Sequence, residues 1–128
     1  TNLRHVLRHE RRDSAARLTE QAKAYIEEHY KESDLSADSL CRCLNVSAAY
    51  FSTIFKREVG MSFVAYLTKI RLEHALELLR TTEDKTYIIA SRVGYMEPNY
   101  FSYVFKKQYG ISPSKYRAEM CEKEKNTD

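Results

Sequence analysis

The sequence is short of the residues that break helices. Its 128 residues include only three glycines and two prolines. Tight hairpin turns and glycine-rich phosphate-binding loops depend on these residues, so such structures have little to be made from here. The composition therefore favours helices, and with 43% hydrophobic residues the chain can form one compact core or two small ones.

Cysteine is also scarce. Cys41, Cys43 and Cys121 cannot all pair within the chain. No secretory leader and no apolar run of membrane length precedes them, which predicts a reducing, cytoplasmic location without membrane attachment. Cys41 and Cys43 lack a second pair of ligands at metal-binding spacing, so we expect no metal site and no cofactor.

The residue patterns of common enzymes are missing as well. The sequence contains no nucleophile elbow, no phosphate loop and no paired acidic residues, and its cysteines lack an evident activating partner. We therefore expect no catalytic residues and no enzymatic activity.

Positive charge is not concentrated in the middle of the chain. The net charge is +3, and residues 1–17 hold five arginines against two acids, whereas residues 118–128 hold two lysines against four acids. We expect residues 1–17 to be a linker or arm and residues 118–128 to be a tail. For Leu3–Arg12, a dimerising or linker helix, a phosphate-contacting arm and a disordered segment all fit the composition, and the linker is favoured.

The sequence contains an internal repeat. When residues 47–66 are laid over residues 97–116, at an offset of fifty, eight positions are identical, against about one expected from average residue usage. The matched pairs are Tyr50/Tyr100, Phe51/Phe101, Ser52/Ser102, Phe55/Phe105, Lys56/Lys106, Gly60/Gly110, Ser62/Ser112 and Tyr66/Tyr116. Two short copies indicate a duplicated supersecondary unit instead of a solenoid.

Each copy predicts a short helix, a tight turn and a second helix that ends at a glycine. The first expected helix is capped by Ser36 and ends at about Leu44, and the second runs over Ala48–Val59 with Ser47 as its cap. In the second copy the expected helices run over Tyr87–Val93, capped by Thr86 and followed by a turn at Gly94, and over Pro98–Tyr109. The expected inward-facing residues are Leu40, Cys43 and Leu44, then Phe51, Ile54 and Phe55, and in the second copy Phe101, Val104 and Phe105.

A long helix connects the copies. Ser62 opens a run from Phe63 to about Arg80 without glycine or proline, which as a helix is about 27 Å long. A further helix, from Leu18 to about Tyr30, precedes the first copy, and Ser112-Pro113 opens a last one. The sequence predicts an all-α fold of about seven helices, in which two helix-turn-helix subdomains are joined by a long connecting helix. The expected boundaries are 18–61 for the first unit, 62–81 for the connecting helix and 82–117 for the second unit.

In a helix-turn-helix the second helix lies in the major groove of DNA, so its outward side chains face the bases. The outward stripes are Ala49, Ser52, Thr53 and Lys56 in the first copy and Asn99, Ser102, Tyr103 and Lys106 in the second. Neither stripe contains an acidic residue. A connecting helix of this length suits two units that bind major-groove segments about one DNA turn, or ~34 Å, apart.

The outward side chains carry hydrogen-bond donors, hydrogen-bond acceptors and methyl groups, which can contact the edges of bases in the major groove. Asn99 can make two hydrogen bonds to an adenine edge, and Thr53 can contact a thymine methyl group. Basic residues that end the two helices suit phosphate contacts, which position a protein without carrying sequence information. These residues are Lys56, Arg57, Lys106 and Lys107.

At these residues the chain resembles the AraC/XylS family of bacterial transcription regulators. The resemblance covers about residues 18–117 and is carried by Ile89–Tyr95, Asn99–Lys107, Gly110–Arg117 and Arg71–Leu79. It implies two helix-turn-helix units joined by a long helix, base contacts from both recognition helices, including Pro98, and double-stranded DNA and RNA polymerase as partners. It also implies transcription activation, or less often repression, under a separate N-terminal regulatory domain.

One departure from the family keeps an alternative open. The first recognition helix has small side chains where many members have long polar or aromatic ones, so this unit is either a base reader or a phosphate anchor. The alternative function is a protein-interaction module that keeps the fold without specific DNA binding. We expect the isolated domain to be monomeric, because both amphipathic faces of each unit are used internally.

The positions of several tyrosines and of one histidine predict structural roles for most of them. Four tyrosines recur with the repeat, which favours packing over base stacking. They are Tyr50, Tyr66, Tyr100 and Tyr116. Tyr103 is the exception because it lies on an outward stripe, and His74 is expected on the surface of the connecting helix.

Overall fold

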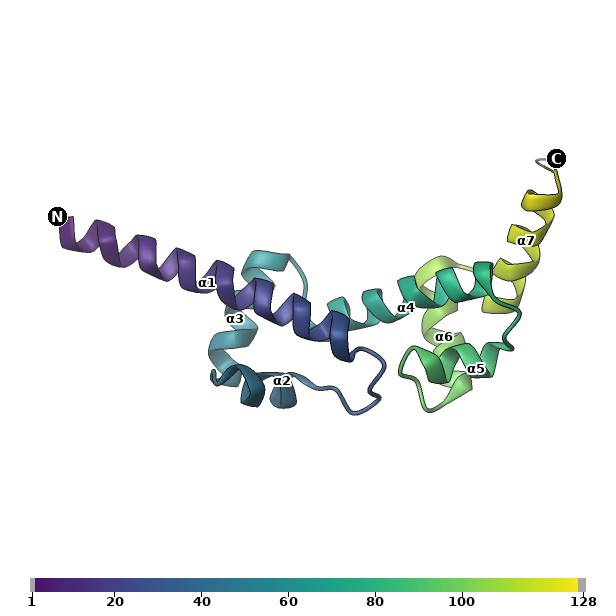
Figure 1. The fold of residues 1–128 in the computed structure, drawn as a ribbon, viewed down its shortest axis with the longest axis horizontal. Coiled ribbons are helices and arrows are strands. Elements are labelled where there is room, and N and C mark those ends of the chain that lie inside the picture. Colours follow the sequence, from purple (N-terminus) through teal and green to yellow (C-terminus); the bar gives the residue numbers. More distant parts are fainter. Residues whose placement is uncertain (1, 127–128) are drawn as a thin grey trace. The chain divides into compact units, whose positions relative to one another are not determined.

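The computed structural model describes the backbone of residues 2–126 and the side chains of residues 13–124, and this part of the chain is all-α (Figure 1). Its seven helices are α1 (Asn2–His29), α2 (Ala37–Leu44), α3 (Ala48–Val59), α4 (Phe63–Thr81), α5 (Thr86–Arg92), α6 (Pro98–Tyr109) and α7 (Pro113–Asn126). The predicted fold class is confirmed.

The helices form two compact units. The first contains α1, α2, α3 and the beginning of α4, and the second contains the rest of α4 with α5, α6 and α7. The second unit also includes Tyr30–Ser33, the segment that follows α1. The long helix predicted between the two repeats is therefore α4, and it contributes residues to both units.

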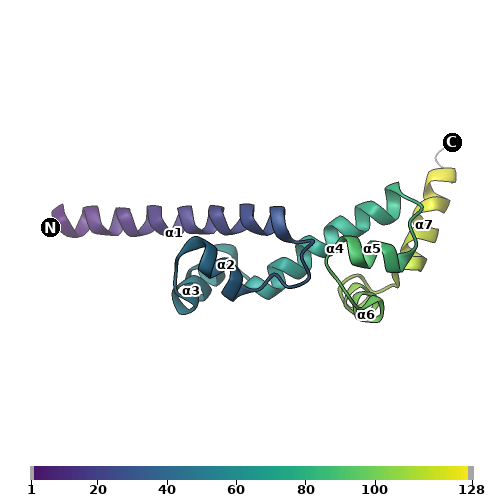
Figure 2. The ribbon, with the colours of Figure 1, turned by 60° about the horizontal axis from the view of Figure 1, so that its bottom comes forward.

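In the first unit, α2 and α3 pack along one side of α1 (Figure 2). The buried apolar residues of α1 recur every three or four positions, as expected of a helix with one apolar face. They are Ala15, Leu18, Ala22 and Ile26. Phe51 and Phe55 of α3 and Phe63 of α4 complete this core, with ring centroids 5.3 to 6.5 Å apart.

The second unit repeats this aromatic arrangement. Phe101 and Phe105 of α6 are fully buried, and the ring of Tyr116 packs edge-on against Phe105 as Tyr66 does against Phe55. Further core residues lie on α4, on α5 and directly after α5. They are Leu72, Ala75, Leu79, Ile89, Ala90 and Val93. The two copies detected in the sequence thus have equivalent cores.

The caps of the first copy form as predicted. The Ser36 hydroxyl accepts a hydrogen bond from the Ser39 amide at 3.1 Å, and the Ser47 hydroxyl accepts one from the Tyr50 amide at 3.2 Å. Gly60 ends α3 in the left-handed conformation with φ of 87°. At the turn, Asn45 takes the same conformation with φ of 56°, which asparagine tolerates better than most residues.

Three predictions about helix ends and faces are wrong. The helix expected from Leu18 is part of α1, which already begins at Asn2, because no glycine or proline interrupts residues 2–29. Thr86 does not cap α5: Lys85 is the N-cap, without a side-chain hydrogen bond, and the Thr86 hydroxyl lies 3.4 Å from that of Ser114. On α2, the inward cysteine is Cys41, and Cys43 is exposed.

The inward position of Cys41 follows from the packing of α2 on α1. Helical spacing places Leu40, Cys41 and Leu44 on one face, but it does the same for the expected residues Leu40, Cys43 and Leu44. Spacing alone therefore does not decide which cysteine faces inward. In the structure the Cys43 sulfur lies 3.3 Å from the Tyr25 hydroxyl at the edge of the α1 contact. Burial, with a smaller contribution from the negative charge of Asp38, raises the pKa of the Cys41 thiol.

An arginine of α4 fixes the segment that follows α1. The guanidinium of Arg71 donates hydrogen bonds to the carbonyl oxygens of Tyr30 at 2.9 Å and Glu32 at 2.8 Å, and it lies over the ring of Tyr95. Burial lowers the pKa of Arg71, although Tyr95 partly offsets that effect. Because the arginine is buried, its charge is stabilised by these carbonyl oxygens and by the aromatic face.

A second arginine has the same role after α4. The guanidinium of Arg117, on α7, donates hydrogen bonds to the carbonyl oxygens of Leu79, Thr82 and Asp84. The Asp84 carboxylate in turn accepts a hydrogen bond from Arg92 at 2.6 Å. These contacts fix the loop between α4 and α5, and so set where α5 begins.

Candidate nucleic-acid interface

The inward face of α3 determines which of its residues are available to a ligand. Phe51, Ile54 and Phe55 are buried, which fixes the rotation of the helix about its axis. The opposite stripe consists of exposed residues, as the sequence predicts. These are Ala49, Ser52, Thr53 and Lys56.

The rotation of α6 is fixed in the same way by Phe101 and Phe105. Pro98 occupies the first turn, where a missing amide costs nothing, and Gly110 ends the helix with φ of 83°. On the opposite stripe Asn99, Tyr103 and Lys106 are exposed, and Ser102 is half-buried. Val104, expected in the core, is also only half-buried.

Two of the candidate residues on α3 already have partners within the helix. The Thr53 hydroxyl donates a hydrogen bond to the Ala49 carbonyl at 3.0 Å, which uses its proton and leaves the oxygen able to accept. Arg57 forms an ion pair with Glu58 at 3.1 Å. Thr53 can therefore accept from a base or touch a methyl group, and the charge of Arg57 is partly compensated before any phosphate binds.

The last turn of α6 is more strongly basic. Lys106 and Lys107 are both exposed there, and the residue that corresponds to Glu58 is Gln108, which carries no charge. The last turns of α3 and α6 therefore differ in net charge. Phosphate attraction is expected to be stronger at α6 than at α3.

Two tyrosines are more exposed than the sequence predicts. Tyr66 and Tyr116 pack as predicted, but Tyr50 and Tyr100 are 45% and 56% exposed, so the packing prediction is wrong for these two. Each precedes a fully buried phenylalanine in the helix. The helical period could have revealed this, since a residue next to the inward stripe lies about 100° away from it.

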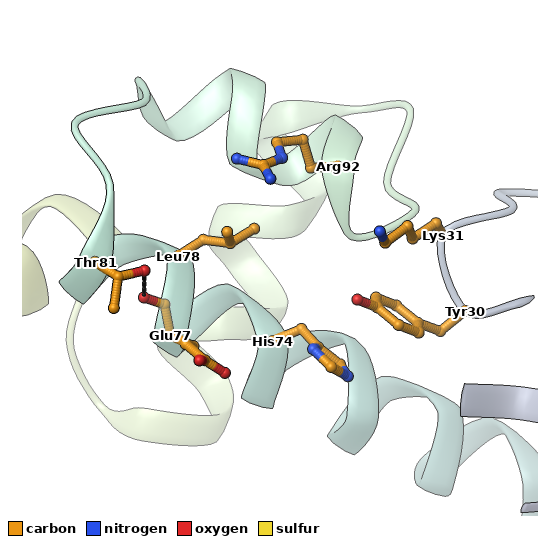
Figure 3. A pocket seen from close by; sticks show the side chains of 7 residues that line it. All are labelled: Tyr30, Lys31, His74, Glu77, Leu78, Thr81 and Arg92. Carbon is orange, nitrogen blue, oxygen red and sulfur yellow. Dashed lines mark hydrogen bonds between the residues drawn. The ribbon is translucent and has the colours of Figure 1, made fainter. Parts of the chain in front are cut away.

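The second unit also contains a pocket, which Figure 3 shows from close by. Tyr30 and His74, which line it, stack with ring centroids 4.1 Å apart, so His74 is half-buried and not the surface residue expected. Lys31 and Arg92 line the pocket as well. None of the predicted DNA contacts lines this pocket, which separates it from the two outward stripes.

The described part of the chain has neither a cluster of metal-binding side chains nor a membrane-spanning helix. Among those residues no three histidine, cysteine or acidic side chains cluster in a way that would hold a metal ion. Over residues 2–126, no helix has both the length and the apolar character needed to cross a membrane.

Comparison with known proteins agrees with this geometry. A family model described as a helix-turn-helix domain matches residues 40–119, which include both repeats and α4. The structure is similar to the C-terminal domain of AraT, a response regulator from Geobacillus stearothermophilus, with 47% sequence identity, a TM-score of 0.79 and coverage of 80% of this chain and 84% of that one. The chain belongs to the AraC/XylS family.

Two further relatives are transcription regulators. The transcriptional activator RhaR of Mannheimia succiniciproducens is 39% identical over 83 residues, which are 65% of this chain and 30% of that protein. The DNA-binding domain of AdpA, a global transcriptional factor solved with a target DNA, is 27% identical, with a TM-score of 0.75 and coverage of 79% and 90%. This chain is therefore an AraC-type helix-turn-helix domain from a family of DNA-binding transcription regulators.

The matched region is only part of the related proteins. The chain spans about a third of the length of the curated AraC/XylS relatives it matches. These relatives are transcription regulators.

Proposed function

We propose that this domain binds a specific double-stranded DNA site by placing α3 and α6 in successive major grooves, and that it activates transcription. The observation that carries the proposal is the equivalence of the two helices: buried phenylalanines fix each one, and each presents an outward stripe without acidic residues. Such a surface can enter a groove lined by phosphates without charge repulsion.

The proposal assigns two kinds of contact. The base-reading residues are Ala49, Ser52, Thr53, Pro98, Asn99, Ser102 and Tyr103. The phosphate-binding residues are Lys56, Arg57, Lys106 and Lys107. Asn99 has the most specific expected contact, because its amide can pair with both the donor and the acceptor of an adenine edge.

We also propose how the domain is used in the cell. Residues 1–17 connect it to an N-terminal regulatory domain, residues 18–61 and 82–117 are the DNA-binding units, residues 62–81 connect them, and residues 118–128 form a tail. RNA polymerase is the expected partner in the cytoplasm, because the related RhaR is an activator. The isolated domain is expected to sediment as a monomer.

Selection of bound duplexes from a random DNA library tests this proposal. We expect a recovered site with two motifs about one helical turn apart, and weaker binding of that site at the higher of two salt concentrations. A single motif would reduce the first unit to a phosphate anchor. The absence of any enriched sequence would contradict specific DNA binding and favour the protein-interaction module.

A further inference from the structure

Tyr50 and Tyr100 occupy the same place in the two recognition helices and are not used by the proposed base contacts. Each is the third residue of its helix, since α3 begins at Ala48 and α6 at Pro98. Both are about half exposed, whereas the next residue of each helix, Phe51 or Phe101, is fully buried. Their exposure is therefore a property of that side of the helix and not of loose packing.

Helical geometry places these tyrosines beside the outward stripe and not on it. Tyr50 lies seven residues before Arg57, so the two share one side of α3 about 10.5 Å apart along the axis. Tyr100 and Lys107 have the same relation on α6. When the outward stripe faces the base edges, this side faces one wall of the groove, where the phosphates lie.

The contact between Tyr100 and Tyr95 also restricts the orientation of the Tyr100 ring. Its ring lies 5.9 Å from that of Tyr95, which is itself buried beneath the guanidinium of Arg71. A ring supported on one side loses less rotamer freedom on binding. A phenol hydroxyl is a neutral donor, and the nearby helix N-terminus favours an anion at this end of α6.

We propose that Tyr50 and Tyr100 each donate a hydrogen bond from the phenol hydroxyl to a DNA backbone phosphate at the edge of the major groove. These contacts set the depth and rotation of α3 and α6 and carry no sequence information. The inference rests on the proposed function, because it requires both helices to lie in major grooves.

The test compares Tyr50→Phe, Tyr100→Phe and wild type on the selected duplex and on a scrambled duplex, at several salt concentrations. Each substitution removes only the hydroxyl, so we expect about tenfold weaker binding to both duplexes. The slope of log affinity against log salt should not change, because a neutral donor displaces no counterion. By contrast, Lys107→Gln should weaken binding and lower that slope by about one.

Two controls separate this role from a structural one. Tyr116→Phe removes a hydroxyl from the packed tyrosine of the same repeat, and it should leave affinity for both duplexes unchanged. The melting temperatures of Tyr50→Phe and Tyr100→Phe should match that of wild type. Replacing single phosphates by neutral methylphosphonates should identify one position per tyrosine at which wild type loses affinity and the phenylalanine variant loses no more.

The outcomes distinguish this proposal from the one on which it rests. Unchanged affinity of both phenylalanine variants, or a loss confined to the selected duplex, would overturn the phosphate contacts and leave specific DNA binding intact. No sequence-specific binding by the wild-type chain would overturn both.

Discussion

Gly94 packs directly against the backbone carbonyl of Tyr30, and a β-carbon at position 94 would overlap that oxygen. The same β-carbon would lie 2.8 Å from the Nε atom of Arg71, which donates its hydrogen bond to the same carbonyl. Gly94 also has φ of 103°, a conformation that other residues rarely adopt. One glycine thus permits both the turn before α6 and the attachment of the segment that follows α1.

Gly94→Ala is predicted to destabilise the domain by about 3 kcal/mol or more. The left-handed conformation accounts for about 1–2 kcal/mol, and the disturbed hydrogen bond between Arg71 and Tyr30 for the rest. Urea unfolding measures the difference. Gly110→Ala is the matched control, since Gly110 has a similar φ of 83° but open space around it, and it should lose only the conformational part. Equal losses in the two variants would refute the role of the Tyr30 contact.

Asn99→Ala is predicted to weaken binding to the selected site by about 1–3 kcal/mol and to relax the preference at one base pair. Binding to scrambled DNA should change little, because only a base contact is removed. Competition binding with duplexes altered at each position measures the effect. Loss of affinity without any change in base preference would show that Asn99 contacts the backbone instead.

Lys106→Ala is predicted to act differently. Removing a phosphate contact should weaken binding to all sequences about equally. It should also lower the slope of log affinity against log salt concentration by about one, because one counterion fewer is released on binding. Titrations of the selected and the scrambled duplex at several salt concentrations give this slope. An unchanged slope would place Lys106 away from the phosphates.

Cys41 is predicted to react with maleimide far more slowly than Cys43 or Cys121, because it alone is buried and its thiol pKa is raised. Single-cysteine variants that keep the native fold provide the comparison, and unfolding in urea should remove the difference in rate.

The same thiol predicts a pH dependence of stability. Because the pKa of Cys41 in the folded state lies above the ordinary value of 9.0, its contribution to stability is complete below about pH 9 and is lost as the pH rises through the folded pKa. A Cys41→Ala variant should therefore lose less stability on passing into alkaline pH than wild type.

The helices and their inward faces were predictable where local chemistry decides them. Ser47 and Gly60 define the ends of α3, and the spacing of Phe51 and Phe55 defines its buried side, so the outward stripe followed from the sequence. The offset of fifty then predicted the equivalent surface of α6. Local periodicity was sufficient here because α3 and α6 each have a narrow and strongly apolar inner face.

Features that depend on contacts between distant segments were not predictable in this way. The choice of Cys41 over Cys43 depends on how α2 packs on α1. The burial of Arg71 depends on carbonyl oxygens about forty residues earlier in the chain. Likewise, His74 is stacked on Tyr30, which no helical period could indicate. These contacts hold the scaffold together, while the residues proposed to bind DNA lie where periodicity alone places them.

The most direct test of the central claim is a hydroxyl-radical footprint on the selected duplex with wild type, Ser52→Asp and Ser102→Asp. Each substitution places a negative charge on one outward stripe, facing the phosphate-lined groove. We predict two protected segments about one helical turn apart for wild type, with each variant losing a different one. A single protected segment for wild type, or full protection by Ser52→Asp, would contradict the claim that both α3 and α6 enter the major groove.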